Sequence, residues 1–108
     1  MSWTLLVVAG VLEIAFAFGM KWSAGFSRFW PSVYAVVTGL SSIVLLTLSL
    51  RVLPVGTAYA VWTGIGAAGT AMLGMLWLGE PVSMARAGCI ALILCGVAGL
   101  KLVSGPAA

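Results

Sequence analysis

One carboxylate, Glu13, lies in the middle of an apolar run that covers residues 3–20. A helix of this length rises about 27 Å, close to the thickness of a bilayer's hydrocarbon core at about 30 Å. Glu13 is therefore predicted to lie near the midplane of a membrane, where an ionised side chain costs roughly 2.5–3.5 kcal/mol on insertion scales. Residues of this kind commonly mark the route of an ion or a substrate. Glu13 is the first candidate binding group.

No fixed cation is predicted beside Glu13 within the apolar runs. The basic residues all lie at the ends of these runs or between them: Lys21, Arg28, Arg51, Arg86 and Lys101. Glu13 is then protonated, paired with its copy in a second chain, or paired with a transient cation. We expect a carboxylate that binds both protons and a cationic substrate; the alternative is a neutral glutamate with a structural role. Gly10 and Phe16 lie one helical turn before and after Glu13 and are expected to line its site.

Polar and aromatic residues on two other runs are candidates to join Glu13. Ser42 lies deep enough in the second run to reach the carboxylate or a substrate, although membrane serines often bond to backbone instead. Tyr59 and Trp62 are three residues apart on the third run and face the same way. Their rings can bind an organic cation by cation–π contact, and the tyrosine hydroxyl can hydrogen-bond Glu13. Packing against lipid is the alternative for this pair.

Glycines on the third and fourth runs predict bending and close helix contacts. Gly64 and Gly66 lower the cost of bending the third helix. Gly88 and Gly96, eight residues apart on the fourth run, belong to a small-residue face suited to close contact between membrane helices. This face is expected to pack either against a second copy of the chain or within the monomer.

The composition requires a membrane environment. Of the 108 residues, 63% are hydrophobic and 6% are charged, whereas a soluble domain carries roughly 25% charged residues. Four continuous apolar runs cover about residues 3–20, 31–50, 55–78 and 84–103. They predict an all-α membrane protein with four transmembrane helices in a single domain, 1–108, rather than a β-barrel.

Several classes of partner and activity have no support in the sequence. The net charge of +3 is dispersed, with no basic tract and no histidine, so no nucleic-acid partner is expected. We see no set of metal ligands, no cofactor motif and no nucleophile–base pair. We therefore expect no metal, no cofactor and no enzymatic activity.

The basic residues favour neither orientation in the membrane. Four spans place Arg51 and Lys101 on one side and Lys21, Arg28 and Arg86 on the other. By the positive-inside rule, this balance permits insertion both ways and predicts an antiparallel homodimer. Two copies would bring their carboxylates into one shared, water-accessible cavity. The alternative is a weak bias that still fixes one orientation.

The third run and its approach carry a specific motif. Residues 53–67, LPVGTAYAVWTGIGA, resemble the signature of the small multidrug resistance family, and more narrowly its guanidinium-exporter subtype. The similarity extends along the whole chain. Other matching positions are Glu13, residues 25–28, Pro31, Ser32, Thr57, Thr63 and residues 99–101.

This resemblance implies a fold, an activity and a set of site residues. It implies an antiparallel, dual-topology homodimer in the bacterial inner membrane that exchanges protons for guanidinium or small substituted guanidinium cations by alternating access. The binding positions that it implies are the paired Glu13 carboxylates, Ser42, Tyr59 and Trp62, with Thr63 beside them and a bend at Gly64 and Gly66. Phe16 departs from the subtype, which usually has tryptophan there, and phenylalanine has no N–H to orient the glutamate. A broader exporter of quaternary ammonium and other lipophilic cations is therefore the alternative.

Overall fold

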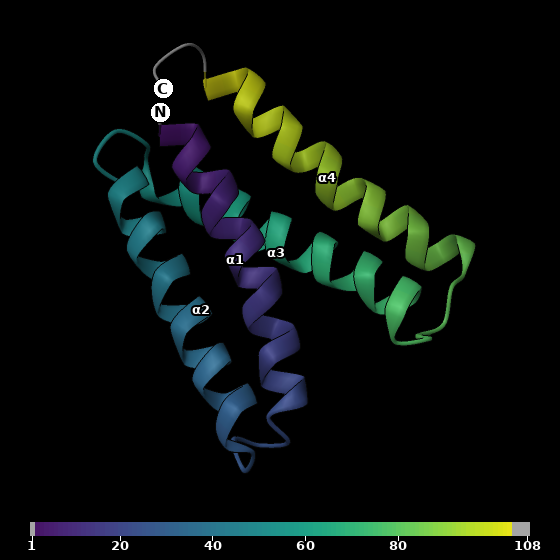
Figure 1. The fold of residues 1–108 in the computed structure, drawn as a ribbon. Coiled ribbons are helices and arrows are strands. Elements are labelled where there is room, and N and C mark those ends of the chain that lie inside the picture. The colour runs from purple at the N-terminus through teal and green to yellow at the C-terminus, as the bar shows by residue number, and fades with distance from the viewer. Residues whose placement is uncertain (1, 105–108) are drawn as a thin grey trace.

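A computed structural model describes residues 2–104 of the chain, and all the regular structure in this range is helical. The helices are α1 (Ser2–Trp22), α2 (Phe29–Ser49), α3 (Val55–Trp77) and α4 (Met84–Ser104) (Figure 1). Each end lies within two residues of the predicted run, and all four helices are long and apolar enough to cross a membrane. The prediction of four membrane-spanning helices is confirmed. The predicted domain, 1–108, also includes Met1 and residues 105–108, which lie outside the described residues.

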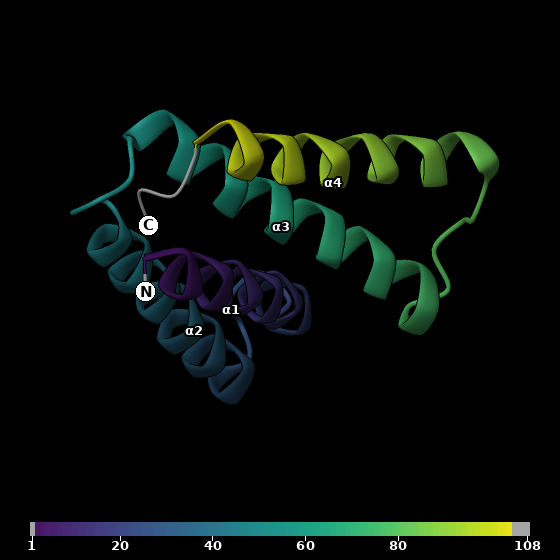
Figure 2. The ribbon, with the colours of Figure 1, turned by 90° about the horizontal axis from the view of Figure 1, so that it is seen from above.

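Helix α1 is central to the arrangement. It forms an antiparallel hairpin with α2 and also packs against α3, which crosses it at an angle (Figure 1). Helix α4 runs back along α3 and packs mainly against it, while Nζ of Lys101 near its end lies 4.8 Å from the centroid of the Trp3 ring of α1. Seen from above, α3 lies between α1 and α4 (Figure 2). The result is a flat molecule of 43 × 34 × 17 Å.

The apolar core lies toward one end of the first three helices. Leu6 and Ala9 of α1 meet Leu46 of α2 and Ala58 and Val61 of α3, and all five are buried. These residues come from the first half of α1, the last turn of α2 and the first half of α3. The opposite halves of α1 and α3 lack this buried cluster, which leaves space there for hollows between the helices.

Glycines allow α1 and α3 to approach closely. A Cβ atom placed at Gly10 would lie 2.6 Å from Cγ2 of Ile65, well inside van der Waals contact. At Gly69, the side chain of Ile14 leaves even less room for a Cβ atom. The two helices therefore interlock, each offering a glycine to an isoleucine of the other. Gly10 was expected to line the site of Glu13, but Ile65 fills the space beside it.

Helix α4, in contrast to α1 and α3, is mostly uncovered by the rest of the described chain. Among its described side chains, only Ile90 is buried. A Cβ atom placed at Gly88, Gly96 or Gly99 would meet nothing within 4 Å. Within residues 2–104, no atom of another helix fills the space beside these three glycines, so close packing of this face within the monomer is not seen. Packing against a second copy stays a prediction.

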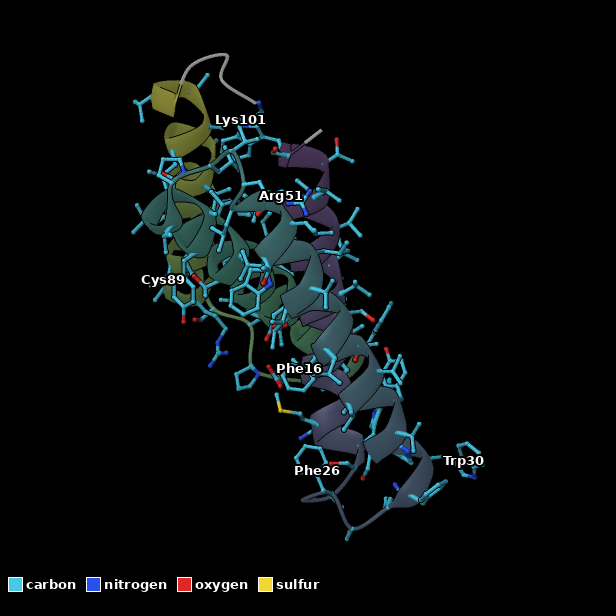
Figure 3. The ribbon with its side chains drawn as sticks, turned by 90° about the vertical axis from the view of Figure 1, so that its left-hand side faces the viewer. Phe16, Phe26, Trp30, Arg51, Cys89 and Lys101 are labelled. Atoms are coloured by element: carbon cyan, nitrogen blue, oxygen red, sulfur yellow. The ribbon has the colours of Figure 1, made fainter. Side chains whose placement is uncertain are left out.

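The first and second loops lie toward opposite ends of the molecule (Figure 3). Arg51 and Lys101 lie toward one end, whereas Phe26 and Trp30, in the first loop and at the start of α2, lie at the other (Figure 3). Phe16 lies between these ends, about midway along the molecule (Figure 3). Glu13, one helical turn before Phe16, is therefore also far from both ends of α1.

Candidate functional site

A hollow of about 290 Å³ lies beside Glu13 where α1, α2 and α3 meet. Its lining residues are Glu13, Phe16, Ala35, Val36, Gly39, Leu40, Ile43 and Trp62. Glu13 is the only charged residue in this lining, and the others are apolar apart from the indole N–H of Trp62. The predicted meeting of Glu13, Phe16 and Trp62 is thus found in the structure.

Two glycines position the α1 side chains of this hollow. A Cβ atom placed at Gly66 of α3 would lie 2.8 Å from Cγ of Glu13, so only glycine leaves room for the glutamate there. A Cβ atom at Gly39 of α2 would lie 2.8 Å from Cδ1 of the Phe16 ring. The sequence assigned Gly66, with Gly64, to a bend. The structure adds direct contact of Gly66 with Glu13, and α3 is helical throughout Val55–Trp77. The bend stays a prediction.

A short chain of hydrogen bonds joins α3, α2 and α1 next to the hollow. The Nε1–H of Trp62 donates to Oγ of Ser42 at 2.8 Å, and Oγ of Ser42 donates to the carbonyl oxygen of Ala9 at 2.6 Å. Ser42 is completely buried. Of the two expectations for Ser42, this conformation shows a backbone bond rather than a contact with Glu13. The serine acts on the site indirectly, by fixing the ring of Trp62.

Tyr59 and Thr63 lie beside the site rather than within the first hollow. The rings of Tyr59 and Trp62 share a face, as expected, with centroids 5.6 Å apart. Tyr59 is 56% exposed, however, and within residues 2–104 its hydroxyl makes no hydrogen bond to Glu13. Thr63 donates its hydroxyl hydrogen to the carbonyl oxygen of Tyr59 at 2.9 Å. The expected Tyr59–Glu13 bond is therefore not formed by a single chain in this conformation.

A second groove, of about 430 Å³, opens on the other side of Glu13. It is lined by Glu13, Ala17, Thr63, Gly66, Ala67, Thr70, Ala71 and Glu80. The sequence reading treated Glu80 only as part of the break between two helices. One signal pointed to it: the chain has two acidic residues in all, Glu13 and Glu80. Both line this groove.

The arrangement suits reversible binding of a cation more than metal binding or covalent chemistry. Within the described part of the chain, no three His, Cys, Asp or Glu side chains come together as metal ligands. Neither hollow is lined by a lysine or arginine that could neutralise Glu13 permanently. What remains is a carboxylate with apolar and aromatic neighbours that opens onto both hollows.

A carboxylate held among three of four membrane-spanning helices fits the family to which comparison assigns the chain. The family model described as "Small Multidrug Resistance protein" matches residues 1–93. The chain belongs to the small multidrug resistance family. It is a multi-pass protein of the bacterial inner membrane, and its family consists of transporters rather than enzymes.

Curated relatives cover almost the whole chain. A guanidinium exporter of Yersinia pseudotuberculosis is 54% identical over 104 residues, which are 96% of this chain and 100% of the relative. A guanidinium exporter of Citrobacter freundii is 51% identical over 102 residues, covering 94% and 97%. One from Escherichia coli O6:H1 is 52% identical over the same shares. The resemblance to the guanidinium-exporter subtype is confirmed as a similarity of sequence.

Proposed function

We propose that this protein is a proton-coupled antiporter that exports guanidinium or small substituted guanidinium cations by alternating access. The observation that carries the proposal is the hollow around Glu13, in which one carboxylate faces apolar walls with no basic residue in the lining. Such a group needs a mobile positive partner, which a proton and an organic cation both supply. The guanidinium exporters at 51–54% identity support the choice of substrate.

Competition for Glu13 provides the coupling in this mechanism. A planar guanidinium presents a fork of N–H donors that a carboxylate can accept in pairs. Bound cation and bound proton exclude one another, so release of one on either side of the membrane permits entry of the other. Two Glu13 side chains in one site would titrate as a coupled pair. An inward proton gradient then drives the cation outward.

We propose an antiparallel homodimer as the working unit. Three features of the single chain support a second copy: the exposed ring of Tyr59, the open glycines of α4, and a hollow beside Glu13 that three helices only partly enclose. A partner facing the other way would enclose the carboxylates and bring Tyr59 toward them. In that assembly, Tyr59 orients the glutamates and Trp62 forms an aromatic wall against the substrate.

The walls of the first hollow also support a second candidate function, export of quaternary ammonium and other lipophilic cations. Phe16 offers no hydrogen-bond donor, and its ring lies against Gly39. Val36, Leu40 and Ile43 of α2 continue this apolar wall. Such a surface accepts alkyl or aryl substituents on a cation, so selectivity toward bare guanidinium depends on hydrogen bonds made elsewhere.

The decisive experiment is transport by the purified protein in liposomes, with proton flux and substrate flux measured together. Guanidinium, phenylguanidinium and tetrapropylammonium are compared in wild type, Glu13→Gln and Phe16→Trp, with protein-free liposomes as the background. We expect a fixed proton-to-guanidinium ratio in wild type and loss of coupled transport in Glu13→Gln, because glutamine neither binds a proton nor carries charge. We expect Phe16→Trp to favour guanidinium over tetrapropylammonium.

Three other results of this experiment would contradict or change the proposed function. Normal coupled transport by Glu13→Gln contradicts the competition mechanism. Flux without a fixed proton ratio indicates a passive channel instead. Faster transport of tetrapropylammonium than guanidinium by wild type favours the lipophilic-cation exporter.

A further inference from the structure

The groove on the far side of Glu13 has a carboxylate at each end. Glu13 lies within α1, whereas Glu80 lies in the short connection between α3 and α4, outside the helices. Between them the lining consists of small residues and the two threonines Thr63 and Thr70. The groove therefore connects the loop after α3 with the partly buried carboxylate of Glu13, and its wall is formed mainly by one face of α3.

The position of Glu80 is fixed by its contact with α3. Its backbone N–H donates to the carbonyl oxygen of Gly74 at 3.2 Å, which folds the loop back onto the helix. A Cβ atom placed at Gly74 would overlap Oε1 and lie 3.0 Å from Oε2 of Glu80. The carboxylate thus rests directly on the backbone of α3, and only glycine allows it to approach so closely.

The electrostatics of this position favour a cation. Gly74 belongs to the last turn of α3, where the negative end of the helix dipole disfavours an anionic side chain. No lysine or arginine lines the groove to compensate. The Glu80 carboxylate is held at the negative end of a helix without a basic neighbour in the lining. A positive ligand that binds reversibly would therefore stabilise it.

We propose that Glu80 forms an outer binding site for small organic cations, at which the substrate waits before it reaches Glu13. This inference rests on the proposed function, which supplies the cation. The site raises the local concentration of cation at the mouth of the groove, where the ligand keeps part of its hydration shell. In an antiparallel dimer the two copies of Glu80 lie at opposite membrane surfaces, so each mouth has one such site.

Transport kinetics provide the first test, using Glu80→Gln, Glu80→Asp and Gly74→Ala in liposomes. An exposed ion pair is worth little, and its loss corresponds to a change of about three- to tenfold. We expect Glu80→Gln to raise KM for guanidinium by this factor with kcat unchanged, and Glu80→Asp to stay closer to wild type. Gly74→Ala keeps the charge but displaces it from the helix, so it should also raise KM. Gly56→Ala, where a Cβ atom meets nothing within 4 Å, is the matched control on α3.

Ionic strength distinguishes a binding role from a structural one. The KM of wild type should rise with added salt, because salt screens the partly exposed carboxylate of Glu80, and the KM of Glu80→Gln should rise less. If Glu80→Gln and Gly74→Ala both have the same KM for guanidinium as wild type, the outer site is overturned and the proposed function stays intact. If Glu80→Gln does not fold, the KM of Gly74→Ala alone tests the outer site in the same way.

Binding to the Glu13→Gln protein tests the groove without transport. Guanidinium chloride added to this variant should shift the amide resonances of Thr70, Ala71 and Glu80, and the shifts should vanish in the Glu13→Gln/Glu80→Gln double variant. Equal shifts in both proteins, or none in either, overturn the outer site. If wild type fails to transport any cation, the proposed function fails while this measurement still decides whether Glu80 binds one.

Discussion

Four glycines within the first three helices and the three glycines of α4 have opposite surroundings. Side chains of neighbouring helices fill the space beside Gly10, Gly39, Gly66 and Gly69, so closely that no Cβ atom fits without displacement. The space beside Gly88, Gly96 and Gly99 is empty. The same residue type, at similar frequency along the helices, is therefore used in two ways. In α1, α2 and α3 it completes the fold of the monomer and seats the site, whereas in α4 it offers a surface that the monomer does not use.

This difference separates the part of the chain that builds the site from the part available for assembly. Helices in lipid gain stability mainly from close van der Waals packing, because lipid is as apolar as their side chains. A helix that packs mainly on one neighbour, as α4 does on α3, forgoes much of that gain. Substitutions at the two sets of glycines should consequently have different effects.

The largest effect is expected from Gly66→Ala. The added methyl group would overlap Cγ of Glu13, so the carboxylate must move or the helices must separate. We expect coupled guanidinium transport to fall at least tenfold, on the order of the loss when a binding group is misplaced by about 1 Å. Transport in liposomes measures this, with Gly56→Ala as the control. Normal transport by Gly66→Ala would show that the contact with Glu13 is not needed.

The next largest effect is expected on stability from Gly69→Ala. Its methyl group would overlap Ile14, and overpacking of this kind typically costs about 1–3 kcal/mol. The free energy of unfolding, measured by titration with a denaturing detergent, should fall by this amount. Truncating the opposing side chain, as in Gly69→Ala/Ile14→Ala, should restore part of the loss, since the two changes act at one contact. Strictly additive losses would contradict the contact.

Gly96→Ala should affect assembly but not the monomer. The added methyl group meets nothing within 4 Å in the chain itself. In the proposed dimer it would separate closely packed helices, and we expect self-association to weaken about three- to tenfold, for a loss of roughly 1 kcal/mol. Energy transfer between labelled chains, diluted stepwise in liposomes, measures this affinity. An unchanged affinity would place the dimer contact elsewhere on the molecule.

The smallest effect is expected from Gly56→Ala in the first turn of α3. No side chain opposes the new methyl group, and alanine favours a helix over glycine by up to about 1 kcal/mol. The protein should be as stable as wild type or slightly more stable, with unchanged transport. A clear loss of stability or of transport would show that this open position is occupied in the assembled protein.

The sequence predicted the helices well because their signal is local. Each run is long and continuously apolar, and glycine, proline or charged residues separate it from the next. Glu13, Phe16 and Trp62 were predicted to lie together, and all three line the first hollow; expected depth in the membrane and helical spacing are enough to predict this. Tyr59 was placed there too, yet in the single chain it is exposed. The role proposed for Tyr59 requires a second chain, which the sequence of one chain does not position.

Other features of the site depend on tertiary contacts that spacing does not encode. Glu80 is far from Glu13 in sequence and lies in a loop, so its place in the same groove follows only from the fold of that loop over Gly74. Likewise, nothing in the sequence distinguished the filled Gly69 from the open Gly96. Which glycine is filled depends on the angle at which the helices cross.

The hydrogen bonds of Ser42 limit which ligand can replace one of its partners. A serine hydroxyl has one hydrogen and two lone pairs, and the hydrogen of Ser42 is already given to the carbonyl oxygen of Ala9. Trp62 occupies one lone pair with its indole N–H. A ligand that takes the place of the indole at Ser42 must therefore bring an N–H of its own. A guanidinium ion can make this exchange of donors, and a quaternary ammonium ion, which has no N–H, cannot.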